Sequence, residues 1–258
     1  MRLRTFGGLS LEDGDPGSPG SPERAAQRPR LALLAVLAAN RHRPVSRDKL
    51  LGFFWPDRDA DDARHSLAQL VNGIRQELGE DVLLSGVDDL RTNPERLAAD
   101  VAEFQDALDR GNLEAAVACY EGAFLDGFFL SDAPEFEHWV EAGRADLARR
   151  CGEAMETLAR GATRANDHTA AAQWWRRRAA LNPLDASVAM ELMRALSRAG
   201  DHAGAIRHAG VHEMFVQSAL DAPTDPDVAV LAKLLREAMR QEPPAAIAIV
   251  APPQSRTR

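Results

Sequence analysis

The strongest constraint on the fold is an amphipathic segment between residues 62 and 78. At about 100° per residue, its apolar side chains fall within about 60° of Leu67 on a helical projection. These side chains are Ala63, Leu70, Val71, Ile74 and Leu78. The opposite side carries Asp62, His65, Gln69, Asn72 and Gln76. The pattern predicts a helix that packs one side against a small core and leaves amide and imidazole groups outside.

Shorter elements are expected on both sides of this helix. The Leu- and Ala-rich run Arg28–Ala39 predicts a first helix, and a second helix begins at the N-cap Ser46 and ends at Trp55, before Pro56. Two short strands are expected within Arg2–Glu12, with a turn at Gly7 and Gly8. Residues 82–85 and 90–92 predict a β-hairpin after the long helix. This order of elements is typical of a winged helix-turn-helix.

The outward side of helix 62–78 suits a DNA groove. Gln and Asn pair with adenine edges, His exchanges hydrogen bonds with bases, and Arg and Lys contact phosphates. The expected base-facing residues are His65, Gln69, Asn72 and Gln76. The expected phosphate partners are Arg41, Arg43, Arg47, Lys49, Arg64, Arg75 and Arg91. The alternative is that this side is simply the solvated face of an amphipathic helix.

The distribution of charge qualifies the formal net charge of -8. Residues 24–49 hold seven basic side chains against one acidic one, whereas residues 100–258 hold 17 basic against 24 acidic. Because phosphate neutralisation supplies most non-specific affinity for nucleic acid, only the first of these regions favours DNA. A solvated charge run remains the alternative.

The second half of the chain contains an internal repeat. Leu158, Asp167, His168 and Ala171 recur 34 residues later as Leu192, Asp201, His202 and Ala205, and 34 residues is the tetratricopeptide period. We therefore expect a TPR-like α-helical array from residue 100 to 240, followed by a tail or linker at 241–258. Partner binding is expected, weakly, at Trp174, Trp175, Arg176 and Arg177; the alternative is a core Trp beside solvated arginines. The fold class is mainly α, with an α+β N-terminal domain.

Several segments together resemble the SARP-type (AfsR/DnrI/RedD) transcriptional regulators. In the first half they are Arg30–Ala35, Pro44–Leu51, Phe54–Asp57, Ala63–Leu67 and Ile74–Gly79; in the second half they are Asp100–Phe104, Tyr120, Phe124–Leu130 and Pro134–Trp139. The resemblance implies an OmpR/PhoB-type winged-helix DNA-binding domain at 1–99. It also implies a bacterial transcriptional activator domain (BTAD) at 100–240. By the same resemblance, the chain is expected to be an activator that forms a homodimer on double-stranded DNA, and its second domain would dimerise, contact RNA polymerase or sense an effector.

Other functional classes have little support. The sequence lacks a phosphate-binding glycine loop, a nucleophile turn and a His/Cys ligand cluster, so we expect no enzymatic activity, cofactor or metal. Two cysteines are too few for a disulfide framework. The sequence contains no run of about 18 apolar residues, the length that a membrane-spanning helix requires. We expect a cytoplasmic protein.

The main alternative function comes from the acidic pair Asp88 and Asp89 at the hairpin, which repels phosphate. In this alternative, the chain is a protein-interaction scaffold with a degenerate winged helix that no longer binds DNA. A third reading makes the chain the sensory part of a larger enzyme.

Overall fold

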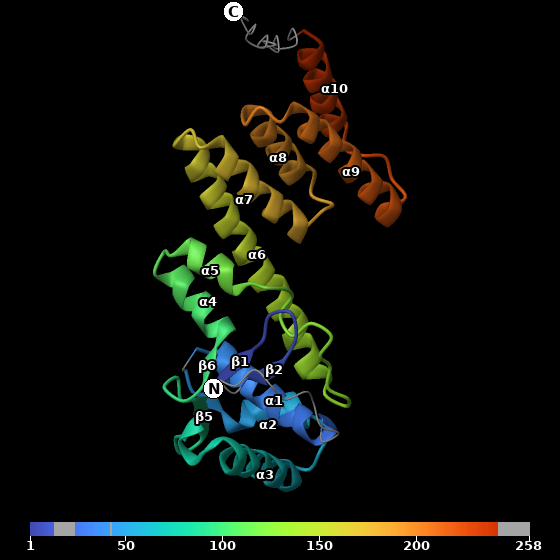
Figure 1. The fold of residues 1–258 in the computed structure, drawn as a ribbon. Helices are drawn as coiled ribbons and strands as arrows, with labels where there is room; N and C mark the ends of the chain where they lie inside the picture. Colours follow the sequence, from blue (N-terminus) through green and yellow to red (C-terminus); the bar gives the residue numbers. More distant parts are fainter. Residues whose placement is uncertain (13–23, 42, 242–258) are drawn as a thin grey trace, which may run out of the picture. The chain divides into compact units, whose positions relative to one another are not determined.

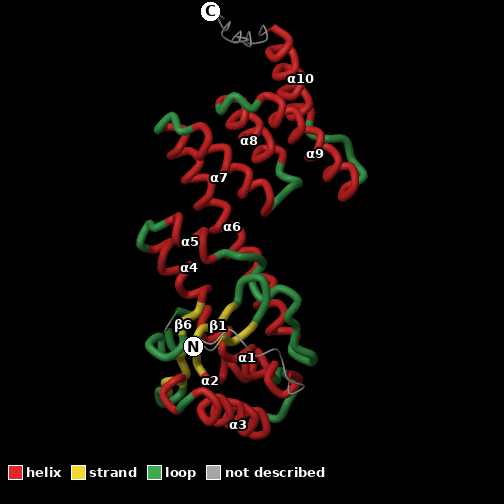
Figure 2. Tube along the Cα trace, viewed as in Figure 1, coloured by secondary structure: helices red, strands yellow, loops and turns green. Residues whose placement is uncertain are grey.

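The computed structural model describes residues 1–12, 24–41 and 43–241, and within them the chain is mainly α with two small sheets (Figures 1 and 2). The expected fold class is confirmed. The chain divides into two compact units, Met1–Leu158 and Ala159–Arg258. The tail expected at 241–258 lies outside the described residues, except for Gln241.

The N-terminal sheet joins strands that are far apart in the sequence. Strand β1 (Arg2–Arg4) pairs antiparallel with β2 (Ser10–Glu12), placing Leu3 opposite Leu11, and parallel with β6 (Ala98–Ala99). Gly7 turns the chain between β1 and β2 with φ of 73°, a conformation that glycine adopts without steric cost. The two expected strands are confirmed. Strand β6 was not expected, because two alanines carry no period-2 pattern.

Three helices follow in the expected order: α1 (Arg24–Ala39), α2 (Arg47–Phe54) and α3 (Ala60–Leu78). Helix α1 begins four residues earlier than expected. Residues 32–38 of α1 are all buried, so this helix forms the centre of the small core. Ser46 caps α2 as expected, its hydroxyl accepting the backbone N–H of Lys49 at 3.3 Å.

The hairpin after α3 is present. A short 3-10 turn, η1 (Glu80–Val82), leads into β4 (Leu83–Ser85) and β5 (Asp89–Thr92), which pair antiparallel with Leu84 opposite Arg91. A two-residue strand, β3 (Val45–Ser46), pairs with the other edge of β5. The hairpin therefore supplies the central strand and one edge of a three-stranded sheet, and β3, directly before α2, forms the other edge.

The core of the first unit continues past residue 99. Helix α4 (Asp100–Asp109) and α5 (Leu113–Cys119) follow β6, and a non-helical segment then leads to the long helix α6 (Pro134–Arg164). The ring of Phe6 packs against Tyr120, Phe104 and Phe124 with centroids 4.7, 5.5 and 6.3 Å apart. The division expected at residue 99 thus falls inside the first compact unit.

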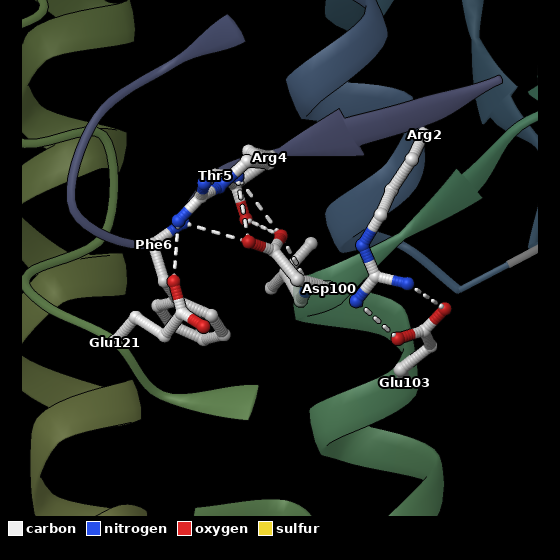
Figure 3. Close-up of polar contacts among 8 residues, drawn as sticks. Arg2, Arg4, Thr5, Phe6, Asp100, Glu103 and Glu121 are labelled. Carbon is white, nitrogen blue, oxygen red and sulfur yellow. Dashed lines mark hydrogen bonds and ion pairs between the residues drawn. The ribbon is translucent and has the colours of Figure 1, made fainter. Parts of the chain in front are cut away.

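The carboxylate of Asp100 fixes this junction (Figure 3). It is 5% exposed and accepts the backbone N–H groups of Thr5, Phe6 and Val101, as well as the hydroxyl of Thr5. Beside it, Arg2 donates two hydrogen bonds to Glu103, at 3.0 and 2.7 Å. Helix α4 is therefore tied directly to the end of β1.

The second unit contains the pairs of helices that the repeat predicts. Helices α7 (His168–Leu181), α8 (Ala186–Arg198), α9 (His202–Leu220) and α10 (Pro226–Gln241) pack in sequence order around a shared apolar core. Asp167 and Asp201, 34 residues apart, cap α7 and α9 through Ala170 N–H and Gly204 N–H at 2.9 and 2.7 Å. The repeated sequence therefore marks equivalent helix starts.

Candidate nucleic-acid interface

Helix α3 has the two sides that its sequence predicts. Its buried side chains are Ala63, Leu67, Val71 and Ile74. Its base-facing set, His65, Gln69, Asn72 and Gln76, is exposed on the other side. A hydrogen bond of 2.8 Å joins the side chains of His65 and Gln69, one helical turn apart. This pair presents one connected polar surface to the outside.

The start of α3 is acidic for a structural reason. The carboxylate of Asp59 accepts the backbone N–H of Asp61 at 2.9 Å and so caps the helix. Asp61 and Asp62 lie in the first turn, where negative charge is stabilised by the helix dipole. Arg64 pairs with Asp61 at 2.9 Å while its side chain stays 62% exposed. An exposed pair of this kind holds its partners weakly, so Arg64 remains accessible.

Arg75, an expected phosphate partner, instead holds the hairpin against α3. Its guanidinium donates to the carbonyl of Leu83 at 3.1 Å and to the hydroxyl of Ser85 at 2.7 Å. Its Nε is buried. Because these contacts use the charged end of the side chain, Arg75 positions the hairpin and does not face a phosphate.

Arg41 is also engaged inside the first unit. It pairs with Asp106 at 2.7 Å and with Asp109, both on or beside the last turn of α4, and its side chain is 28% exposed. Burial lowers the pKa of Arg41, but the hydrogen bonds that its guanidinium donates to these two carboxylates outweigh burial and raise the pKa above its ordinary value. Arg41 therefore joins α1 to α4 and leaves the expected phosphate set. Helical periodicity gave no signal of this contact, which spans 65 residues.

Four basic residues keep the arrangement expected of phosphate partners. Arg43, Lys49 and Arg91 are exposed and Arg47 is half-buried; among the described residues none of the four pairs with an acidic side chain. The ammonium of Lys49 lies 5.6 Å from the centre of the Phe53 ring. The backbone N–H of Arg47 donates to the carbonyl of Asp88 at 2.8 Å. This bond ties the start of α2, and the cations there, to the hairpin loop.

Sequence reasoning missed Arg58. Its guanidinium donates to the hydroxyl of Ser66 at 3.1 Å, and it lines a cavity of about 350 Å³ that Gln69 also lines. Arg58 therefore adds a cation beside the polar side of α3. Its position in the acidic run 57–62 concealed it, although a lone basic residue immediately before a candidate reading helix is the signal that marks it.

A second arginine explains the glycine within α3. A Cβ atom on Gly73 would lie 2.7 Å from Nη2 of Arg30, because the guanidinium of Arg30 rests on the helix there. Arg30 is held in place by Glu77, one turn further along α3, at 2.8 Å. Gly73 is thus the contact point between α1 and α3.

The hairpin loop is acidic and open. Asp88 is exposed, and Val87 is 94% exposed at the end of the loop. Asp89 is turned inward, its carboxylate accepting the backbone N–H of Gly86 at 3.1 Å. One of the two carboxylates of the expected acidic wing is thus used to shape the turn, leaving Asp88 as the charge that faces outward.

The residues expected to bind a partner separate into two groups. Trp175 is 3% exposed and belongs to the core of the second unit, so it leaves this set. Trp174 is half-buried, with the guanidinium of Arg177 5.0 Å from its ring centre. Arg176 and Arg177 are exposed on the same helix. The alternative stated from the sequence, one core Trp beside solvated arginines, describes this helix better.

Other kinds of site receive no support from the described part of the chain. No group of three or more His, Cys, Asp or Glu side chains is placed to hold a metal there. Cys119 and Cys151 form no disulfide within the described residues. Among the helices described, none combines the length and the apolar character that crossing a membrane requires.

Comparison with known proteins places the second half of the chain in a family. The family described as "bacterial transcriptional activator domain" matches residues 93–240, more than half of the sequence. No curated protein matches the chain. A similar solved structure is that of Mycobacterium tuberculosis EmbR in complex with a low-affinity phosphopeptide. It has a TM-score of 0.55 and 21% sequence identity, and the match covers 94% of this chain and 65% of that one.

At 21% identity the likeness to EmbR concerns the fold, and the chain spans less than two thirds of that protein's length. The fold likeness extends over both units, whereas the family match begins at residue 93, just before β6 and α4. The two findings agree on the helical part of the molecule. The chain belongs to the bacterial transcriptional activator domain family, whose members are regulators of the transcriptional-activator type.

Proposed function

We propose that this protein is a DNA-binding transcriptional activator whose first 99 residues act as an OmpR/PhoB-type winged helix. Helix α3 enters the major groove, and the hairpin β4–β5 serves as the wing. The observation that carries the proposal is the exposed, hydrogen-bonding side of α3. The opposite side of the helix packs in the core. The two hydrogen bonds by which Arg75 holds the hairpin against α3 support the proposal, because a wing must be held at a fixed place beside the reading helix.

The residues are assigned by role. His65, Gln69, Asn72 and Gln76 face the bases. Phosphates are contacted by Arg43, Arg47, Lys49, Arg64 and Arg91, with Arg58 added to the set. Arg43, Lys49 and Arg91 are exposed and have no acidic partner among the described residues, so they neutralise phosphates without first losing an internal ion pair, whereas Arg64 gives up only its exposed pair with Asp61.

The helical array is assigned to regulation. Its family membership supports roles in homodimer formation on DNA, in contact with RNA polymerase or in effector sensing. The 34-residue period and the equivalent caps of α7 and α9 support a TPR-like array, an architecture that presents extended binding surfaces. Because the proposed ligand is chromosomal DNA, this proposal places the protein in the cytoplasm.

A selection of bound duplexes from genomic fragments tests the assignment of α3. Replacing Gln69 and Asn72 with Ala is expected to relax the selected sequence, because a good bidentate base contact contributes about 1 to 3 kcal/mol of discrimination. The matched control is Gln173→Ala, an exposed glutamine on α7. An unchanged consensus in the α3 variant would remove both residues from the reading surface.

The acidic hairpin loop and the acidic first turn of α3 favour a second candidate, a protein-interaction scaffold that no longer binds DNA. Salt separates the two functions. DNA binding through phosphates gives an affinity that falls steeply with the logarithm of the salt concentration, whereas a scaffold retains no duplex even at low ionic strength.

A further inference from the structure

The second unit contains a cavity of about 540 Å³ between α7, α8 and α9, helices that lie side by side (Figure 1). Its volume falls within the range of about 300 to 1,000 Å³ that is typical of small-molecule sites. The floor is apolar and buried, formed by Ala179, Ala189, Leu192 and Leu196. Phe215 and Val211 lie at the rim, 47% and 46% exposed. The space exists because small side chains occupy facing positions on α7 and α8.

The carboxylates that line the cavity have hydrogen-bond donors, whereas one of its guanidinium groups has no acidic partner. Asp185 accepts the backbone N–H groups of Ser187 and Val188 at the start of α8, and Asp201 accepts that of Gly204 at the start of α9. Both carboxylates are thus neutralised by helix N-termini. Arg207 lies 3.9 Å from Asp201, and Arg176 has no acidic partner within the described residues. The cavity therefore presents one guanidinium without an acidic partner, that of Arg176, beside an apolar floor.

Two histidines in the lining each have one ring nitrogen without a hydrogen-bond partner. His212 is 2% exposed; its Nδ1 lies 2.9 Å from the carbonyl of Pro183, so Nδ1 carries a proton, while its Nε2 is buried without a partner. His208, one turn earlier on α9, also has a buried Nε2 without a partner. Burial, and then the proximity of His212 and Arg176, lower the pKa of His208. An anion between these groups would supply the missing partners and the missing negative charge.

We propose that this cavity binds a small amphipathic carboxylic acid. The apolar body of the ligand lies on the floor formed by α7 and α8, and its carboxylate pairs with Arg176 and with the protonated imidazole of His208. A neutral apolar ligand leaves the guanidinium and both imidazoles without a partner, so the carboxylate decides the class of ligand. The site lies within the second unit and does not depend on DNA binding.

Isothermal titration of the full-length protein with octanoate and with 1-octanol tests the proposal. The two probes share an alkyl chain and differ in charge. Octanoate is expected to bind at least about tenfold more tightly, and its binding is expected to take up a proton. Uptake is read from titrations in buffers of different ionisation enthalpy. The titratable or charged groups that face His208 are His212 and Arg207 on α9, Arg176 on α7, and Asp185 and Asp201 in the turns; the α8 lining is apolar.

Two pairs of variants locate the site. Arg176→Gln is expected to weaken octanoate binding at least about tenfold, whereas Arg198→Gln, on an exposed residue of α8 that does not line the cavity, is expected to leave it unchanged. Ala180→Trp fills the cavity from an exposed position and is expected to abolish binding. Ala203→Trp, exposed on α9 outside the lining, is its control.

Three results would overturn the proposal. Equal affinity for octanoate and 1-octanol, unchanged by Arg176→Gln, would show that the cavity binds alkyl chains without recognising a carboxylate. Octanoate binding that survives Ala180→Trp places the ligand elsewhere. Absence of octanoate binding together with saturable binding of an acidic peptide assigns the groove to a protein partner. Each result is independent of DNA retention, so failure here leaves the proposed function standing.

Discussion

Asp100 is the residue on which the junction between β1 and α4 most directly depends. Its buried carboxylate satisfies three backbone N–H groups and one hydroxyl (Figure 3). A buried amide left without an acceptor costs about 1 to 3 kcal/mol. The same few atoms therefore orient the end of β1, the start of α4 and the ring of Phe6 between them.

Replacing Asp100 with Ala is expected to lower the free energy of unfolding of the first unit by about 2 to 5 kcal/mol, because the N–H groups of Thr5 and Phe6 lose their acceptor. Urea denaturation followed by circular dichroism measures the loss. Asp126→Ala, which removes an exposed carboxylate from the segment between α5 and α6, serves as control and should change stability little. Equal stabilities of the two variants would show that the Asp100 contacts are dispensable.

The second unit is expected to lose stability as the pH falls below about 6.5. The pKa of His208 is lowered from 6.5, first by burial and then by His212 and Arg176, so the unfolded chain binds the proton more readily. Stability is therefore fully present above 6.5 and declines as the pH falls through the lowered pKa. His208→Gln should flatten this part of the profile in thermal melts between pH 7 and pH 5.

A carboxylate does not produce the same window. Burial raises the pKa of Asp185, but hydrogen bonds from Ser187 and Val188 outweigh it and lower the pKa below 3.8. Its contribution to stability is lost only at more acidic pH. A profile that His208→Gln leaves unchanged between pH 7 and pH 5 would contradict the role of this imidazole.

At the scale of elements, the sequence predicted what periodicity and capping encode. Helix α3, the hairpin and the cap at Ser46 lie within a few residues of their expected places, and the repeated residues Asp167 and Asp201 precede equivalent helices. Strands β3 and β6 were missed because two residues carry no alternation, and pairing across more than 40 positions leaves no local trace.

The candidate site was predictable only in part, for a related reason. The angle of a residue on a helix decides whether its Cβ faces the core, and this placed Gln69 and Asn72 correctly on the outside of α3. Long arginine side chains reach several ångströms from the backbone. The destinations of Arg41 on α4 and of Arg75 on β4 therefore depended on tertiary packing that periodicity does not encode.

Replacing Arg75 with Met is expected to loosen the hairpin without removing a phosphate contact. The carbonyl of Leu83 and the hydroxyl of Ser85 lose their donor, so amide exchange in β4 and β5 should accelerate. DNA affinity should fall with an unchanged salt slope. Arg43→Gln, by contrast, removes an exposed cation and should reduce the slope by about one. A reduced slope in Arg75→Met would return this residue to the phosphate set.

At the scale of the whole molecule, the boundary of the first compact unit and the start of the family match do not coincide. The family match begins at residue 93, whereas the compact unit extends to Leu158. The reason is physical. The N-terminal strand β1 pairs with β6, and Phe6 packs among rings contributed by α4, the residue after α5 and the following segment. The N-terminal segment therefore shares its core with the first helices of the activator domain.

A fragment of residues 1–99 is accordingly expected to be markedly less stable than a fragment of residues 1–158. The shorter fragment leaves Phe6 without the aromatic rings that pack against it and Thr5 without the carboxylate of Asp100. It also strips Arg41 of both its acidic partners. Thermal melts of the two fragments followed by circular dichroism measure the difference.

Cooperative unfolding of both fragments at the same temperature would show that the core of the N-terminal segment is complete before residue 100. In that case duplex binding by the short fragment alone would match that of the longer one. If instead the longer fragment alone melts cooperatively and retains duplex, the start of the activator domain is part of the DNA-binding unit.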